Sequence, residues 1–256
     1  MKRIAIITAA ALGLGLGLSS CATESTTPVE PGKYVPATAG SYFIHGNRAF
    51  DTDAGGATDT VDVLSDSTVV TGTKTVEGRS AVESIIYVGG FPIDTSYDAQ
   101  QGSVVSTLLP LEFDVLGAPV DLGKKWVNLY DENSSSWTAL RDTIPTFTID
   151  AGPSGSYTGS AGLDFTGKKL GTETVTINGV SVATQKVEIT LNITLYLMFG
   201  PQAVPVPIQL VRTYWFANNI GWVKMMQPAK VVNIMGIPPL PIDGAESTLL
   251  RYNIVK

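Results

Sequence analysis

The chain has 256 residues, of which 44% are hydrophobic and 16% are charged, with 23 acidic against 17 basic side chains. This length allows a substantial core without disulfide bonds, and a single cysteine excludes an internal disulfide framework. The acidic balance, without a basic run, argues against nucleic acid as a partner.

The N-terminus has the pattern of a secretory signal peptide. Lys2 and Arg3 form a charged n-region, and residues 4–18 are apolar and uncharged, too short for a membrane span. The glycines of "ALGLGLGLSSC" do not form a dinucleotide fingerprint, because Leu18 stands where G-x-G-x-x-G needs its third glycine and no strand precedes it. We therefore predict a signal peptide over residues 1–20.

The stretch "LSSC", which ends at Cys21, resembles the lipobox of bacterial lipoproteins. The resemblance implies that the Cys21 thiol takes a diacylglycerol, that the chain is cut before Cys21, and that the new amine is acylated. Several acyl chains give a firm membrane anchor. By the same resemblance, Ala22 in place of an aspartate implies the outer membrane of the bacterial envelope. The alternative is an ordinary signal peptide followed by an accidental cysteine.

Removal of the signal peptide leaves 15 basic against 23 acidic side chains, a net charge of about −8. Residues 21–40 are rich in Thr, Ser, Pro and Glu without any periodicity, which predicts a lipidated, flexible tether. Residues 41–256 are then expected to form one domain.

From residue 41 onward the hydrophobic pattern has a period of two, which predicts β-strands. The clearest example is "KVEITLNITLYLMF", in which one face carries Val187, Ile189, Leu191, Ile193, Leu195, Leu197 and Phe199. Asn178-Gly179 between two alternating runs predicts a hairpin, and residues 218–221 predict a second one. Further strands are expected over 41–50, 60–64, 69–76, 81–88, 104–113, 125–130, 146–150 and 248–255. Two proline-rich segments, 199–209 and 235–246, are expected to interrupt strand pairing.

These elements predict an all-β fold with a single antiparallel domain, either a curved sheet or half-barrel or a sandwich. The stretch "TYWFANNIGWVKMM" resembles a motif of uncharacterised bacterial cell-envelope proteins, in the order W-F-A-x-x-I-G-x-V-K. The matching positions run from Trp215 to Lys224 and include Gly221. The resemblance implies a curved antiparallel sheet, related in shape to periplasmic lipoprotein-carrier half-barrels, and carries no known catalytic residue.

The sequence favours a protein that is not an enzyme and has no cofactor. His45 is the only histidine and is expected at an edge or a turn. G-x-S-x-G is absent, and the usual His/Cys ligands of zinc are lacking. Carboxylates for a glycosidase-like hydrolase are available, but no spacing singles out a pair.

An aspartate-rich loop, "DTDAGGATDTVD", is a weak calcium candidate. Asp51, Asp53, Asp59 and Asp62 occupy positions 1, 3, 9 and 12 of an EF-hand-like pattern. Gly55 lacks the carboxylate expected at position 5, position 12 lacks the longer glutamate, and no helix flanks the loop. A solvated loop without a metal is therefore preferred.

Trp215 and Trp222 flank the second predicted hairpin turn. We expect them to pack in the core or against each other across the hairpin. The alternative is that they face a ligand.

Taken together, the sequence predicts a lipid-anchored envelope protein with a non-catalytic domain that binds or scaffolds, with an apolar ligand or a lipoprotein as cargo. The alternative is a glycan-binding or adhesive surface module that uses exposed tryptophans and aspartates, and a hydrolase with paired carboxylates comes third. An apolar cavity would favour the first hypothesis, and a flat face with exposed tryptophan beside the aspartate loop would favour the second.

The anchor is tested by the substitution Cys21→Ser. We expect this variant to be released as a soluble, folded periplasmic protein, because the acyl chains on Cys21 are the predicted attachment to the membrane. Fractionation of cell extracts with a high-salt wash measures this. A variant that still sediments with membranes would show that lipidation of Cys21 is not the anchor.

Overall fold

The computed structural model describes residues 31–53, 55–62, 65–115, 118–150, 156–199, 202–233 and 239–256. Cys21 and the predicted signal peptide lie outside the described residues. Within the described ranges, no helix is long and apolar enough to cross a membrane.

The described chain is built from antiparallel strands. They are β1 (Tyr42–Thr52), β2 (Thr58–Asp62), β3 (Asp66–Val76), β4 (Arg79–Val88), β5 (Phe91–Gln101), β6 (Val104–Val115), β7 (Ala118–Asp131), β8 (Ser136–Asp150), β9 (Ser156–Ile177), β10 (Val180–Phe199), β11 (Gln202–Ala217), β12 (Gly221–Gln227), β13 (Lys230–Val232), β14 (Leu240–Ile242) and β15 (Gly244–Asn253).

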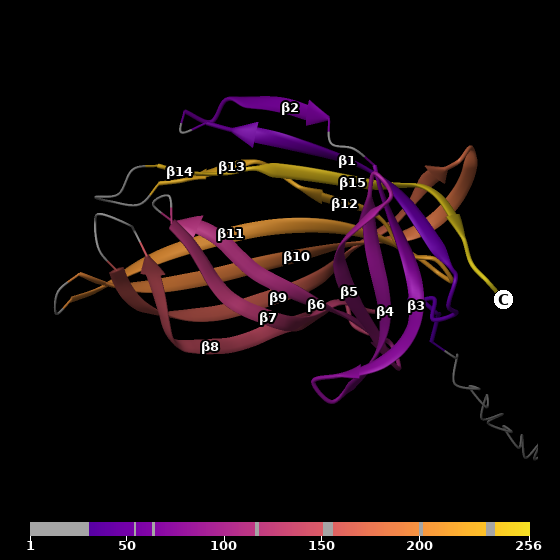
Figure 1. The fold of residues 1–256 in the computed structure, drawn as a ribbon, viewed down its shortest axis with the longest axis horizontal. Coiled ribbons are helices and arrows are strands. Elements are labelled where there is room, and N and C mark those ends of the chain that lie inside the picture. The colour runs from indigo at the N-terminus through magenta and orange to yellow at the C-terminus, as the bar shows by residue number, and fades with distance from the viewer. Residues whose placement is uncertain are drawn as a thin grey trace, which may run out of the picture. The chain divides into compact units, whose positions relative to one another are not determined.

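Twelve of these strands follow one another in a single sheet in the order β7-β6-β5-β4-β3-β1-β15-β12-β11-β10-β9-β8, with β2 paired to β1. The sheet curls until its two end strands approach each other and it nearly closes into a barrel (Figure 1). Where the ends meet, Trp137 Nε1 of β8 donates a hydrogen bond to the Asn128 carbonyl of β7 over 2.8 Å. The all-β prediction is confirmed, and of the architectures expected the structure has the curved sheet, not the sandwich.

The strongest local predictions are confirmed. From Val187 to Leu197 the alternating apolar face of β10 is buried throughout. Val180 pairs with Ile177 across the predicted hairpin, and Asn178 and Gly179 both have positive φ, as a type I′ turn requires. The second hairpin joins β11 to β12, with Ala217 paired to Gly221.

The prediction for the first proline-rich segment is wrong. Pro205 and Pro207 lie within β11, opposite Tyr196 and Thr194 of β10, and the pairing continues through both. The two prolines are two residues apart, so their nitrogens point to the same side of the strand. Pairing of β11 with β12 begins only at Thr213. The side of β11 that faces away from β10 therefore has no strand hydrogen bond to make at Pro205 or Pro207, and the missing N–H groups cost no pairing there. The second segment lies partly outside the described residues.

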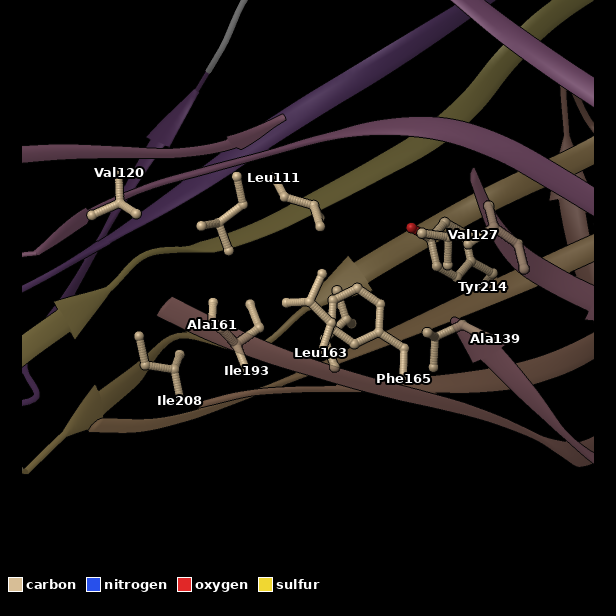
Figure 2. Packing of buried hydrophobic residues seen from close by; sticks show 14 of the residues in the cluster. Leu111, Val120, Val127, Ala139, Ala161, Leu163, Phe165, Ile193, Ile208 and Tyr214 are labelled. Atoms are coloured by element: carbon tan, nitrogen blue, oxygen red, sulfur yellow. The ribbon is translucent and has the colours of Figure 1, made fainter. Parts of the chain in front are cut away.

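The main core lies inside the curve of the sheet. Side chains from β6 to β11 pack against one another there, among them Val127, Phe165 and Ile193 (Figure 2). Smaller apolar clusters occupy other parts of the sheet. One includes Trp215 and Leu249, and another includes Leu108 and Trp126.

Residues 31–36, which composition assigns to the flexible tether, instead pack against the domain; we call them the N-terminal strap. Tyr34 is 8% exposed, its backbone N–H donates to Gln100 Oε1 over 2.8 Å, and its hydroxyl lies 3.0 Å from Glu132 Oε1. Its ring meets Tyr130 edge-on at 4.9 Å. The expectation of a tether that extends to residue 40 is thus corrected for these residues, because a buried aromatic ring and backbone hydrogen bonds hold them in place.

The strap also contacts the turn between β11 and β12. The backbone N–H of Lys33 donates to Asn218 Oδ1 over 2.9 Å, and the Asn219 N–H donates back to the Lys33 carbonyl over 2.5 Å. Gly221 has a φ of +104°, and a Cβ added there would lie 2.9 Å from the Tyr34 carbonyl oxygen. The turn and the strap therefore fix each other.

A comparison of two turn glycines isolates this contact. Gly179 also has positive φ, but an added Cβ there would meet no atom within 4 Å. We expect Gly179→Ala to lower the free energy of unfolding by about 1–2 kcal/mol through backbone strain. We expect Gly221→Ala to cost at least about 1 kcal/mol more, because it also displaces the strap. Urea unfolding measures both, and equal losses would contradict the packing of the strap on this turn.

Candidate functional site: a cavity beside the N-terminal strap

A cavity of about 290 Å³ lies inside the curved sheet. The inner faces of β1 and β3–β6 form one part of its lining and those of β11 and β12 another, and the strap contributes Tyr34, Val35 and Pro36. Most lining side chains are apolar, and five are aromatic rings. The aromatic residues are Tyr34, Phe43, Tyr214, Phe216 and Trp222. A concave, mostly apolar site with a few polar groups is the usual form of a small-molecule pocket.

Asp98 on β5 is the carboxylate in this lining. Its neighbours across the sheet are Val82 of β4 and Thr107 of β6. Burial raises the pKa of Asp98 from 3.8 to about 6, and the Thr107 hydroxyl opposes this rise only in part. Among the described residues no basic side chain forms an ion pair with Asp98, so its charge is held in an apolar cavity without a counter-ion.

His45 on β1 also lines the cavity and is 5% exposed. Its ring stacks on Trp222 with centroids 4.3 Å apart, and its Nδ1 lies 3.5 Å from Asp66 Oδ1. Burial acts to raise the pKa of Asp66, but the contacts with His45 and Asn47 outweigh it and hold that pKa below its ordinary value. A proton on Nδ1 would face this carboxylate and leave Nε2 as a hydrogen-bond acceptor. Nε2 is buried and has no partner within the described structure.

His45 is therefore not the edge or turn residue that the sequence predicts. β1 pairs with β15 on one side and with β3 on the other, so His45 lies in the interior of the sheet. The hydroxyl of Ser84 also lines the cavity, but it does not complete a catalytic triad. Ser84 pairs with Val70, four residues along β3 from Asp66, which separates the two sites by about 13 Å.

Arg212 is the one basic side chain besides His45 among the described residues that line the cavity. Its Nε donates to Gln227 Oε1 over 2.8 Å, and the side chain is partly exposed. Arg212 thus already has a hydrogen-bond partner, whereas the polar contact of Asp98, which is also partly exposed, comes from the Thr107 hydroxyl.

The two candidate aromatics have different environments. Trp215 is 4% exposed, and Lys186 and Lys224 lie over its ring at 4.8 and 5.2 Å. It belongs to the apolar cluster with Leu249 and does not line the cavity, whereas Trp222 does. Of the two packings expected, Trp215 has the core packing. The two tryptophans do not pair across the hairpin, because a bulge pairs Trp222 with Phe216 and Trp215 with Lys224.

The aspartate loop forms the β1–β2 hairpin. Asp51 pairs directly with Asp59, and Asp53 Oδ1 accepts hydrogen bonds from the backbone N–H groups of Gly55 and Ala57. These bonds explain Asp53 as a turn residue; the side chain of Asp62 lies outside the described structure. Within the described ranges no group of three or more His, Cys, Asp or Glu side chains is arranged to hold a metal ion. The calcium hypothesis stays a prediction.

Comparison with known proteins gave no match to a family model and none to a curated protein. Among solved structures, the chain is similar to a Parabacteroides distasonis protein provisionally described as a lipoprotein. The identity is 14%, the alignment covers 88% of this chain and 100% of the other, and the TM-score is 0.45. It is also similar to a Bacteroides fragilis protein provisionally described as exported, with a YmcC-like fold, at 12% identity, 87% and 99% coverage and a TM-score of 0.37. At these values neither likeness carries an argument about the function of this chain.

The raised pKa of Asp98 makes stability depend on pH in a predictable direction. The folded protein holds this proton more tightly than the unfolded chain does, so the contribution of Asp98 to the free energy of unfolding should fall as pH rises from about 4 to about 6.5. The destabilisation caused by the charged Asp98 side chain is complete above that range and absent below about pH 4. We expect Asp98→Asn to remove it and to raise the free energy of unfolding at pH 7.5 by up to about 3 kcal/mol.

Urea unfolding at pH 4 and pH 7.5 measures this effect. The control is Asp94→Asn, the same substitution at an exposed position of β5, which should show no such gain. An Asp98→Asn variant no more stable than the parent at pH 7.5 would contradict a desolvated carboxylate in the cavity.

Proposed function

We propose that this protein binds a small, largely apolar molecule in the cavity of its curved sheet, as a non-catalytic domain tethered to the bacterial envelope. The single observation that carries the proposal is the cavity of about 290 Å³ with its apolar and aromatic lining. Protein interiors are normally packed with few voids larger than a water molecule. A space of this size that a domain leaves unfilled is therefore a candidate binding site.

The size of the cavity limits the ligand. An apolar cavity of about 150 Å³ holds one benzene ring, so this cavity holds roughly a dozen non-hydrogen atoms. The several acyl chains of a lipoprotein are much larger. The cavity volume therefore favours a small molecule over a lipoprotein as the cargo.

The arrangement of polar groups supports binding without catalysis. A glycosidase-type mechanism needs two carboxylates that flank one bond. Of the described residues that line the cavity, Asp98 alone supplies a carboxylate. The separation of Ser84 from the His45–Asp66 pair argues in the same way against a serine nucleophile.

The glycan-binding hypothesis required an exposed tryptophan beside the aspartate loop. Trp126 and Trp215 are buried, while Trp137 and Trp222 are partly buried. Trp222 faces the cavity. None of the four is fully exposed on the surface, and this observation favours the cavity as the binding site.

The envelope location rests on the sequence of the N-terminus. The lipobox-like "LSSC" and the signal peptide before it support attachment through acyl chains on Cys21, in the outer membrane. The domain would then present its cavity in an aqueous compartment beside that membrane.

Ligand binding is tested with 1-methylnaphthalene, an apolar probe of eleven carbon atoms, by isothermal titration calorimetry. We expect saturable one-to-one binding with a negative heat-capacity change, the mark of apolar burial. Ser96→Phe places a ring in the cavity, because Ser96 lines it, and should abolish binding. Ser80→Phe, at an exposed position of β4, is the matched control and should bind as the parent does. Equal binding by both variants would place the probe outside the cavity.

A further inference from the structure

The cavity combines an unpaired carboxylate with aromatic walls. Val105 and Leu109 of β6 line the cavity on either side of Thr107, which is opposite Asp98. The apolar surroundings of Asp98 disfavour its charged form, and the neighbouring polar contact comes from a neutral hydroxyl. Asp98 is partly exposed, and within the described residues it lacks the ionic partner that charges in apolar surroundings normally have.

The five aromatic rings of the lining favour the same sign of charge in a ligand. The face of a Tyr, Phe or Trp ring is electrostatically negative and attracts cations, most strongly where water is excluded. It disfavours anions for the same reason. The carboxylate and the rings thus select for positive charge together.

Arg212 is the feature that favours the opposite charge. It is partly exposed, and its Nε is already bonded to Gln227. Asp98 is partly exposed too, but its contact is with a neutral hydroxyl and its apolar surroundings disfavour the charge, so a ligand cation gains more at Asp98 than an anion gains at the already bonded Arg212.

We propose that the cavity takes a small organic ammonium ion, a primary amine on an apolar body about the size of two fused rings, with the charged nitrogen against the Asp98 carboxylate. This assignment rests on the proposed function, since it requires the cavity to be a binding site. An amine supplies the missing counter-ion, and its apolar body fills the space between the aromatic walls. His45 lines the same cavity from β1, with β3 and β4 between β1 and β5 in the sheet.

The structure also explains why an amine would be preferred over an alcohol of the same shape. An alcohol donates one hydrogen bond to Asp98 but brings no charge, so the carboxylate keeps most of its desolvation cost. Hydrogen bonds between two charged groups are roughly twice as strong as neutral ones. Discrimination should therefore depend on the charge of Asp98 and be lost with it.

Three probes that share one ring system test the assignment at pH 7.5. They are 1-naphthylmethylamine, 1-naphthylmethanol and 1-naphthoate, which are a cation, a neutral molecule and an anion. We expect the amine to bind at least tenfold more tightly than the alcohol, and the naphthoate to bind most weakly. Asp98→Asn should weaken amine binding at least tenfold and leave alcohol binding within about threefold of the parent, which also shows that the cavity remains intact. Asp94→Asn should leave all three affinities unchanged.

The possible outcomes distinguish failure of the ammonium assignment from failure of the proposed ligand binding. If the amine and the alcohol bind alike and Asp98→Asn changes neither, apolar binding stands and the ammonium assignment is overturned. If the naphthoate binds most tightly, the assignment is overturned in favour of an anion at Arg212. If none of the three probes binds, nor 1-methylnaphthalene, the proposed function itself fails.

Discussion

The meeting of β7 and β8, the two end strands of one long sheet, is the constraint on which the rest of the structure depends. Because the ends meet, one face of every strand between them points inward. Lys125 Nζ and Asp142 Oδ2, 2.6 Å apart, and the Trp137 hydrogen bond mark this junction. A partly exposed ion pair contributes at most about 1 kcal/mol, so polar contacts alone do not hold the sheet closed. Burial of apolar side chains in the interior holds it closed, and Phe165, Leu195 and Val206 there are completely buried.

The size of the inward side chains differs between parts of the sheet, and this difference creates the cavity. Under β6 to β11, large aliphatic and aromatic side chains interdigitate and fill the space (Figure 2). On β3 to β5 the inward side chains are smaller, and include Thr68, Ser84 and Ser96. They do not reach the aromatic rings of β11 and β12 on the other part of the lining. When a nearly closed sheet has small inward side chains on several adjacent strands, a space is left inside it. The hydrogen-bonded strands around that space hold its walls apart, so the backbone does not move in to fill it.

The sequence predicts those parts of the fold that have a local cause. β10 has an unbroken alternation of apolar and polar residues, and Asn178-Gly179 suits one turn type, so both could be predicted without knowledge of their neighbours. β5 could not be predicted in this way. Its inward positions Ser96, Asp98 and Gln100 are polar, and Phe91 and Ile93 near its start are exposed. That pattern is typical of a loop. Asp98, the carboxylate on which the proposed ligand assignment depends, lies on this strand.

The site as a whole has no local signal either. Its lining runs from Tyr34 to Met225 in the sequence, and only the pairing order of the sheet brings these residues together. Tyr34 lies in a segment rich in Pro and Thr that has the composition of a tether. Its burial depends on hydrogen bonds of Lys33 and Tyr34 to Gln100, Glu132 and Asn218, which span 66 to 185 residues of the chain. In retrospect, the signal in the sequence is a single aromatic residue two positions after a glycine in a segment rich in Pro and Thr, which is too common to be diagnostic.

The docked strap changes the geometry of the predicted anchor. If Cys21 carries the acyl chains, ten residues of sequence separate it from Pro31, where the strap begins. Fully extended, ten residues reach at most about 35 Å. The strap that ends this tether also supplies Tyr34, Val35 and Pro36 to the cavity lining. If the proposed lipid anchor at Cys21 is present, the segment that joins it to the domain is therefore continuous in sequence with a wall of the proposed binding site.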